Sequence, residues 1–405
     1  MNRIATGRPD IIRLLASPAG QLLIWLIAIP LLWRNGVPAI VLVALTLTML
    51  LPKHRRAILS VASGALLLRY FAQAGFADTS SVLPAVILIM ACFGLYRLAI
   101  LLDQPAPALT RHPWMLLHAL IWSCLILLFF MPKSPTLLAG VALISSMTWA
   151  AAYLFAAGRR GQLKGTGFHD HFFYLMPFHT LGFPINLGKG HDYLSRHEAQ
   201  NPEQLARSQL AGLKLLFLAV VWSFSVDLIE AIAYRPDDNW YTTLLPAFGP
   251  QIPHLGDLIR HRAGFSLPVA WASLILEFID MILQLAIWGH VAIALLRLTG
   301  FNVFRHTYRP LLAESIVDFW GRMGFYFKEI CVDFFFYPVF LRCTWARPEL
   351  RLFLAIFAAA FVGNLYWHLL KNSVWLVTWD IQAFSDFFIP RMIYMAALTT
   401  GIWIS

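Results

Sequence analysis

The chain has 405 residues, of which 59% are hydrophobic and only 13% are charged. A soluble domain has about 25% charged and about 45–50% apolar residues. A soluble fold of this length is therefore excluded, because its interior could not hold so much apolar surface. The net charge of +10 does not indicate nucleic-acid binding, since the basic residues lie in short clusters between apolar runs.

Long apolar runs follow one another along the chain and are predicted to be membrane helices. About 20 apolar residues cross the hydrocarbon core as a helix, and a helix satisfies its own backbone hydrogen bonds in lipid. The sequence therefore predicts an all-α polytopic membrane protein. The runs lie at 21–33, 37–51, 57–71, 83–102, 114–131, 137–157, 210–232, 267–298, 350–370 and 387–405.

Three basic clusters predict how the chain is oriented in the membrane. Counting spans from a cytoplasmic N-terminus places all three on the same side, as the positive-inside rule requires. The first apolar run shows no small-residue cleavage pattern after its basic lead, so we expect it to remain as a helix. The clusters are Arg3, Arg8 and Arg13; Lys53, Arg55 and Arg56; and Arg159, Arg160 and Lys164.

The chain is expected to form two blocks. Residues 1–157 form an N-terminal transmembrane helical block of about six spans. Residues 158–405 form a second block, in which the polar stretches 158–208 and 234–265 interrupt the apolar pattern. Irregular backbone at membrane depth is tolerated only where protein encloses it or where it lines a cavity. A functional site is therefore expected in the second block.

The pair Trp367-His368 lies inside the apolar run 350–370. An ionisable residue within a span is costly and is a functional candidate by default. Histidine can accept a proton near neutral pH and is the commonest general base. Two interpretations stay open from position alone: a catalytic base, or a ring that bonds the carbonyl of a neighbouring helix.

The stretch 309–337 is charged at helical spacing and also rich in aromatic residues. Such a segment is too polar to span freely, and its rings favour a helix at the membrane interface or along a funnel. Arg322 and Lys328 are candidates for binding the phosphates of a carrier or of phospholipid headgroups. The alternative is a set of ordinary interfacial anchors.

His169-Asp170-His171, near His179 and His191, has residue types that bind metals. The triplet is a weak signal, because its side chains point apart on a helix and share one face only on a strand. Polar packing in a re-entrant loop is the favoured interpretation, and no metal site is predicted. The sequence has no nucleophile elbow, P-loop or dinucleotide fingerprint.

Four segments, in order, resemble the membrane-bound O-acyltransferase family, in its bacterial branch of alginate O-acetyltransferases and teichoic-acid D-alanyltransferases. The aromatic segment 173–185, which contains His179, resembles one that ends in Gly-Pro-Ile in the family. The segment 288–301 resembles a stretch with a closing Gly-Phe, and His290 stands at the family's Asp. The segment 308–322 resembles an Arg-Pro followed by Asp-Phe-Trp, and Trp367-His368 resembles the pair with the essential histidine.

The resemblance implies a helical barrel of about 11 transmembrane or re-entrant helices around a central tunnel, in a bacterial inner membrane. It implies transfer of an acetyl or other short acyl group from a cytoplasmic thioester to a hydroxyl of an envelope glycan, lipid or secreted metabolite. The donor would be acyl-CoA or an acyl-carrier protein, with no bound cofactor, and a carrier or periplasmic protein would be a partner. His368 would be the base and Trp367 would shape the tunnel. The implied binding residues are Arg322, Lys328, Asp318, Trp320, His290 and His179.

The sequence departs from the family pattern at its other prominent histidine, where it has Gly324, preceded by Met323 in place of Trp. This departure leaves open a catalytically silent relative that binds a lipid-linked substrate. A second alternative is a transporter or channel whose path uses buried polar residues. Its candidate residues are Glu277, Asp280, His290 and His368.

Overall fold

The structure, a computed structural model, is helical throughout its described part. These residues contain no strand, and their one β-contact is an isolated bridge between Glu198 and Phe301. The predicted all-helical class is therefore confirmed. The described residues are 8–73, 82–102, 113–175, 189–234, 252–256, 258, 266–345 and 347–405.

Six helical segments in the described part are long and apolar enough to cross a membrane. A seventh is added if the bent pair α1 and α2 counts as one span. The predicted membrane protein is supported at this level, whereas the count of 11 helices and the barrel stay predictions. The six are α5 (Val82–Leu101), α7 (Pro135–Arg159), α10 with η4 (Pro202–Tyr234), α13 (Leu267–Leu298), α17 to α18 (Pro348–Lys371) and α20 (Ile381–Ile404).

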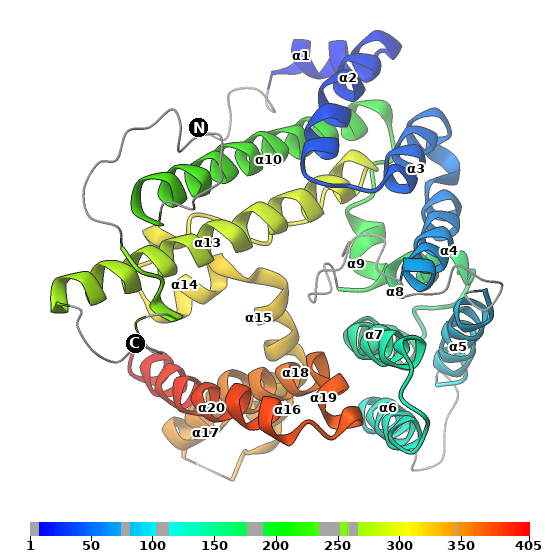
Figure 1. Ribbon diagram of the computed structural model, residues 1–405. Coiled ribbons are helices and arrows are strands. Elements are labelled where there is room, and N and C mark those ends of the chain that lie inside the picture. The colour runs from blue at the N-terminus through cyan, green and yellow to red at the C-terminus, as the bar shows by residue number, and fades with distance from the viewer. Residues whose placement is uncertain are drawn as a thin grey trace.

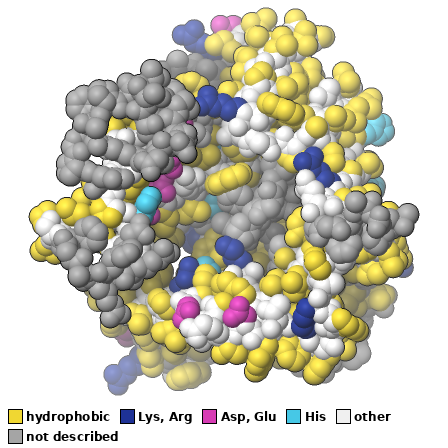
Figure 2. Space-filling view, in the orientation of Figure 1, with side chains coloured by type: hydrophobic (Ala, Val, Ile, Leu, Met, Phe, Trp, Pro, Cys, Tyr) yellow, Lys and Arg dark blue, Asp and Glu magenta, His cyan; other side chains and the backbone are white. Residues whose placement is uncertain are grey.

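Large apolar side chains point outward from these helices. Leu26, Ile87 and Ile393 are 64%, 59% and 70% exposed. Figure 2 shows hydrophobic side chains over much of the coloured part of one face's rim, with few charged ones among them. Soluble proteins rarely expose apolar patches of this extent to water. In hydrocarbon such a surface carries no comparable cost, so these faces suit contact with lipid.

The N-terminal block begins with α1 (Pro9–Ala16), which meets α2 (Pro18–Arg34) at 88°. Next, α3 (Ala39–Leu50) has 12 residues, or about 18 Å of helix, because Pro38 precedes it and Pro52 follows it closely. It is too short to span alone, so the predicted six spans of this block stay a prediction. The block continues with η1 (Pro52–His54), α4 (Arg55–Gln73), α5, α6 (Pro113–Phe129) and α7.

The second block combines long and short helices. The long α10 packs along α13, and Figure 1 shows the long helices arranged around the short α8, α9 and α15. The shorter elements are α8 (His169–Leu175), α9 (His191–Arg196), η5 (Pro310–Leu312), α14 (Ile316–Met323), α15 (Phe325–Cys331), α16 (Tyr337–Arg342) and α19 (Ser373–Thr378).

Two π-helical segments, η6 (Val332–Phe336) and η7 (Phe357–Gly363), pack against each other. Their close approach requires a glycine, since a Cβ at Gly363 would lie 2.8 Å from the Phe335 ring. The helix α18 (Asn364–Lys371) follows η7 directly. Single π-turns within helices are frequent at functional sites, so α18 is a candidate location for the site.

Gly300 connects α13 to the bridge that Glu198 and Phe301 form. Its φ is +100°, and a Cβ there would lie 2.4 Å from Nη1 of Arg55. We expect Gly300→Ala to destabilise the protein by more than the roughly 1–3 kcal/mol of a strained backbone alone, because the guanidinium must also move. Thermal unfolding in detergent measures the loss.

Gly36→Ala is the matched control, because Gly36 also has a positive φ, +71°, but nothing lies within 4 Å of its Cβ position. Gly36→Ala should lose only the stability that backbone strain at a positive φ costs. Equal losses in the two variants would show that the contact with Arg55 does not matter.

Candidate functional site

His368 lies on α18 between two aromatic rings. Its ring centroid is 4.8 Å from that of Trp367 and 5.5 Å from that of Phe387 on α20. Its Nδ1 is buried and has no hydrogen-bond partner in the described part of the chain. Its own carbonyl accepts from Nδ2 of Asn372 at 2.8 Å. Aromatic packing, and not a hydrogen bond at Nδ1, therefore holds the imidazole.

Two cations lie on the same aromatic rings that hold His368. Nζ of Lys371 is 5.4 Å from the Trp367 ring centroid, and the Arg391 guanidinium is 3.4 Å from that of Phe387. Lys371 follows His368 by three residues, so both side chains share one face of α18. The arrangement places positive charge beside a potential base, where it could stabilise a developing oxyanion.

An apolar cavity of about 350 Å³ lies next to this site. Phe327 lines it and packs against Trp367, with ring centroids 5.1 Å apart. Asn364 also lines it, one helical turn before His368, although His368 is not itself part of the wall. The structure thus brings the predicted residues Trp320 and Lys328 to a cavity beside the Trp367-His368 pair.

The two cations that the sequence predicted, Arg322 and Lys328, are already paired. Nε of Arg322 bonds Oδ1 of Asp318 at 2.7 Å along α14, and Nζ of Lys328 lies 2.8 Å from Oε1 of Glu329. Any phosphate of a donor would have to compete with these carboxylates. The predicted residues Arg322 and Asp318 therefore form a pair with each other, and neither is among the residues that line the cavity.

A polar pocket of about 510 Å³ lies between the end of α7, α9 and α15. Lys189 bridges Glu329 and Asp333 at 2.6 and 2.9 Å, and the Tyr153 hydroxyl donates to Asp333 at 2.9 Å. Burial alone would raise the pKa of Glu329, but the bonds from Lys189 and Lys328 outweigh it and lower the pKa. Sequence analysis missed Lys189 and Tyr153, because neither belongs to a local pattern.

His290 is buried near the end of α13, beside a second histidine that the sequence analysis did not select. A Cβ at Gly289 would lie 3.1 Å from His306 Cδ2, so the glycine lets that ring approach. His306 is 3% exposed, stacks on Tyr326 and has no partner for Nδ1 among the described residues. Burial lowers the pKa of His306 to about 4. No contact in the described part joins either ring to His368.

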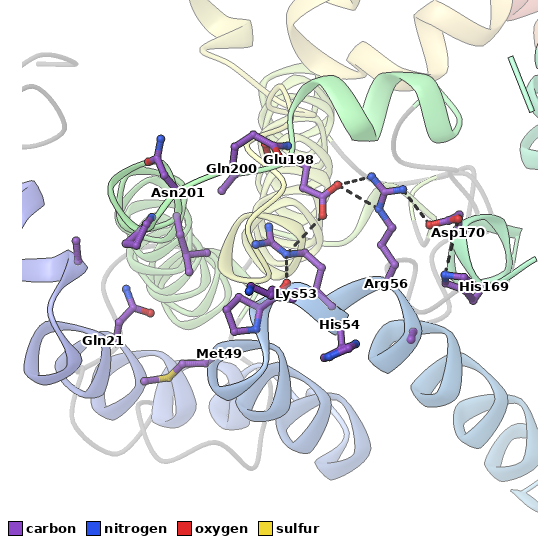
Figure 3. A pocket seen from close by; sticks show the side chains of 17 residues that line it. Gln21, Met49, Lys53, His54, Arg56, His169, Asp170, Glu198, Gln200 and Asn201 are labelled. Carbon is purple, nitrogen blue, oxygen red and sulfur yellow. Dashed lines mark hydrogen bonds and ion pairs between the residues drawn. The ribbon is translucent and has the colours of Figure 1, made fainter. Parts of the chain in front are cut away.

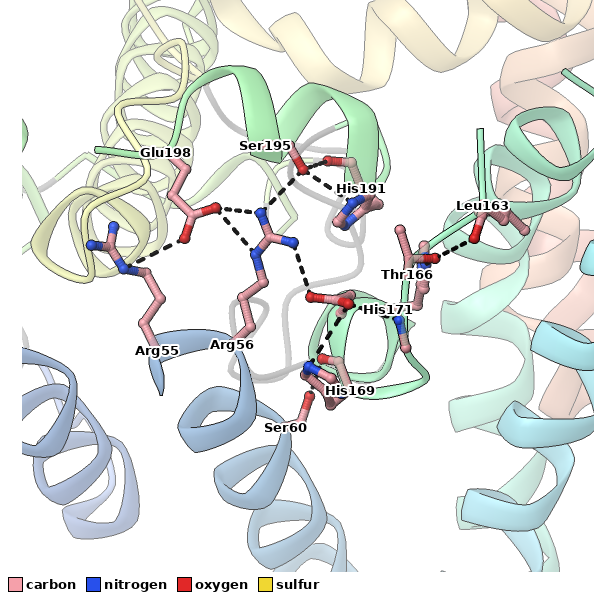
Figure 4. Close-up of polar contacts among 12 residues, drawn as sticks. Arg55, Arg56, Ser60, Leu163, Thr166, His169, His171, His191, Ser195 and Glu198 are labelled. Carbon is pink, nitrogen blue, oxygen red and sulfur yellow. Dashed lines mark hydrogen bonds and ion pairs between the residues drawn. The ribbon is translucent and has the colours of Figure 1, made fainter. Parts of the chain in front are cut away.

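Asp170, on α8, takes part in an ion-pair network. Its Oδ1 is 2.9 Å from Nη1 of Arg56, and Arg56 also bonds Glu198 (Figure 4). His171 instead meets the Thr166 hydroxyl at 2.8 Å. In the part of the chain that the structure describes, no group of three or more His, Cys, Asp or Glu side chains could hold a metal ion. The favoured interpretation of the triplet, polar packing, agrees with these contacts.

This network predicts an acid-sensitive fold. Burial raises the pKa of Asp170, but the Gly167 N–H and Arg56 outweigh it, so the pKa lies below its ordinary value. A carboxylate with a lowered folded-state pKa stabilises the fold at neutral pH and loses that contribution as the pH falls through this value. We expect the Tm to decrease as the pH is lowered past about 4. The decrease should be smaller in Asp170→Asn, whose Tm is already lower than that of the wild type at pH 7. Superimposable pH profiles would contradict this.

Tyr366 is a second residue that sequence analysis missed. Its hydroxyl accepts from Trp122 Nε1 at 2.9 Å and lies 2.5 Å from Nδ1 of His118. These contacts tie α18 to α6 two residues before His368. The spacing of four between Trp114, His118 and Trp122 marks one face of a helix and could have indicated a shared partner.

Two predicted features remain to be placed. His179, with the rest of 176–188, lies outside the described residues. Gly324 lies between α14 and α15, and a Cβ there would meet only the Phe327 Cβ, at 3.8 Å. The backbone thus leaves room for a side chain at Gly324. No family model matches the chain, and no curated protein matches it.

Proposed function

We propose that this chain is a membrane-bound O-acyltransferase with His368 as its general base. It transfers an acetyl or other short acyl group from a cytoplasmic thioester to a hydroxyl of an envelope glycan, lipid or secreted metabolite. In this proposal about 11 transmembrane or re-entrant helices form a barrel around a tunnel in a bacterial inner membrane, and the N-terminus is cytoplasmic.

One observation carries the proposal. A histidine with an unpartnered, buried Nδ1 among the described residues lies in a membrane-spanning segment, one helical turn from an apolar cavity of about 350 Å³. Three segments distant in sequence line that cavity: 317–336, which carries Trp320 and Lys328, 352–364, which carries Asn364, and 398–402. Convergence of separate segments on one apolar cavity with a few polar groups is typical of ligand sites.

The reaction follows from the roles of these groups. The imidazole takes the proton of the acceptor hydroxyl while that oxygen attacks the thioester carbon. The carbonyl electrons move to oxygen, where Lys371 or Arg391 offsets the negative charge. When the carbonyl re-forms, the C–S bond breaks and the thiolate leaves with the proton that the imidazole held. No covalent enzyme intermediate is needed, and the apolar cavity would hold the acyl chain.

The test uses purified protein in liposomes with labelled acetyl-CoA and, separately, an acetylated carrier protein. We expect thiol release and transfer of the label to an added hydroxyl acceptor. Uptake of solute without any donor would favour the transporter instead. An intact donor together with tight acceptor binding would favour the catalytically silent relative. That alternative rests on Gly324, which has no side chain where the family has its second histidine.

A further inference from the structure

A third pocket, of about 780 Å³, lies apart from the apolar cavity and from His368. It shares no lining residue with the apolar cavity. Its walls come from helix ends of the N-terminal block, from the start of α8, and from 198–205, where α10 begins. Lys53, His54 and Arg56 surround it with Glu198 and Asn201 (Figure 3). The acyl-transfer proposal does not use this pocket.

The charges of the pocket favour an anion. Both of its carboxylates, Asp170 and Glu198, are already engaged by Arg56, and Glu198 also lies 3.5 Å from Arg55 Nε. Lys53 and His54 are exposed at the pocket. They face no third carboxylate in its wall, so positive charge remains for a ligand.

Arg55 supplies an independent observation. It is only 6% exposed, yet its Nη1 has no hydrogen-bond partner among the described residues. A buried donor without a partner is costly, and burial lowers the pKa of this guanidinium. An anion in the pocket that Arg55 lines would offset the cost of burying this charge.

The helix ends place the pocket at one membrane surface. The apolar α2 begins there, the apolar α3 ends there, and α4 and α10 begin there. Beside it, α1 runs nearly perpendicular to α2, with Ile12 and Leu15 buried and Arg13 exposed. A helix that is perpendicular to a spanning helix at its end runs along the membrane surface, at the depth of the headgroups.

We propose that this pocket binds a phosphate group, carried by the headgroup of an anionic membrane lipid or present as free phosphate. Lys53 and His54 meet the phosphate at the entrance, and Arg55 contributes charge from the wall. This site is independent of acyl transfer and stands if that function fails.

The experiment compares the thermal stability of the whole 405-residue chain in detergent micelles with each of three additives. Micelles receive phosphatidylglycerol, phosphatidylcholine at equal amount, or inorganic phosphate against chloride at equal ionic strength. The variant is Lys53→Gln/His54→Gln, which changes only exposed side chains. The matched control, Arg34→Gln, removes an exposed cation at the opposite end of α2.

We expect phosphatidylglycerol, but not phosphatidylcholine, to raise the Tm of the wild type and of Arg34→Gln. The apparent affinity should fall about fivefold or more in the double variant. A matching effect of inorganic phosphate, lost in the double variant, would identify free phosphate as the ligand. If neither additive acts, or if the double variant responds as the control does, the proposal is overturned.

Discussion

Replacing His368 by Ala or Gln should lower acyl transfer by about 10²–10⁴-fold, the usual contribution of a general base. Gln is the sharper change, because it keeps polarity and much of the volume but cannot accept the proton. Since Nδ1 has no hydrogen-bond partner among the described residues, neither variant breaks a bond at that atom. The measurement is thiol release from the acyl donor by purified variants in liposomes.

The control for this prediction is His254→Gln, which alters a histidine that pairs with Glu277 in the first half of α13. It should leave transfer within about twofold of the wild type. A stably inserted His368→Gln with wild-type turnover would eliminate the ring as the base, and the enzyme proposal with it.

Filling the apolar cavity should have the next largest effect. Ala360 lines it, and Ala360→Phe would occupy part of its volume of about 350 Å³. Pockets discriminate single methylene groups by about 10–200-fold, so transfer of four- to six-carbon acyl groups should fall by about tenfold or more. Acetyl transfer should fall less, because a two-carbon chain needs little of the cavity.

Ala397→Phe is the matched control, since Ala397 is exposed on α20 and is not part of the cavity wall. It adds the same ring toward the outside and should preserve the chain-length profile. If Ala360→Phe lowers the transfer of all acyl groups equally, whatever their length, or lowers none, the cavity is not where the acyl chain binds.

Apolar length was enough to predict the principal helices. The run 267–298 coincides with α13, and 83–102 differs from α5 (Val82–Leu101) by one residue at each end. The agreement is physical, because a helix that crosses lipid must remain apolar for its whole length. Run 37–51 was too long for α3, since Pro38 and Pro52 confine that helix to 12 residues.

The site was predictable only where one residue carried the signal alone. His368 could be selected because a titratable group within an apolar run is conspicuous. The carboxylate partners of Arg322 and Lys328 could not be assigned, because each cation has several acidic neighbours in the sequence. Lys189 and His306 acquire meaning only from contacts made across the fold, with Glu329 and Tyr326 respectively.

The π-helical segment η7 determines which way the second half of its membrane segment faces. Each π-turn takes in one more residue than an α-turn, so side chains beyond it are rotated by about 100°, one residue's step of an α-helix. That rotation keeps one stripe buried from α17 (Pro348–Ile356) into α18, because Ala355, Ala359, Gly363 and Trp367 are buried at every fourth residue, a spacing that drifts around a regular α-helix. The π-turns thus let the span keep one face on the protein along its length, which brings Trp367 and the neighbouring imidazole to the interior.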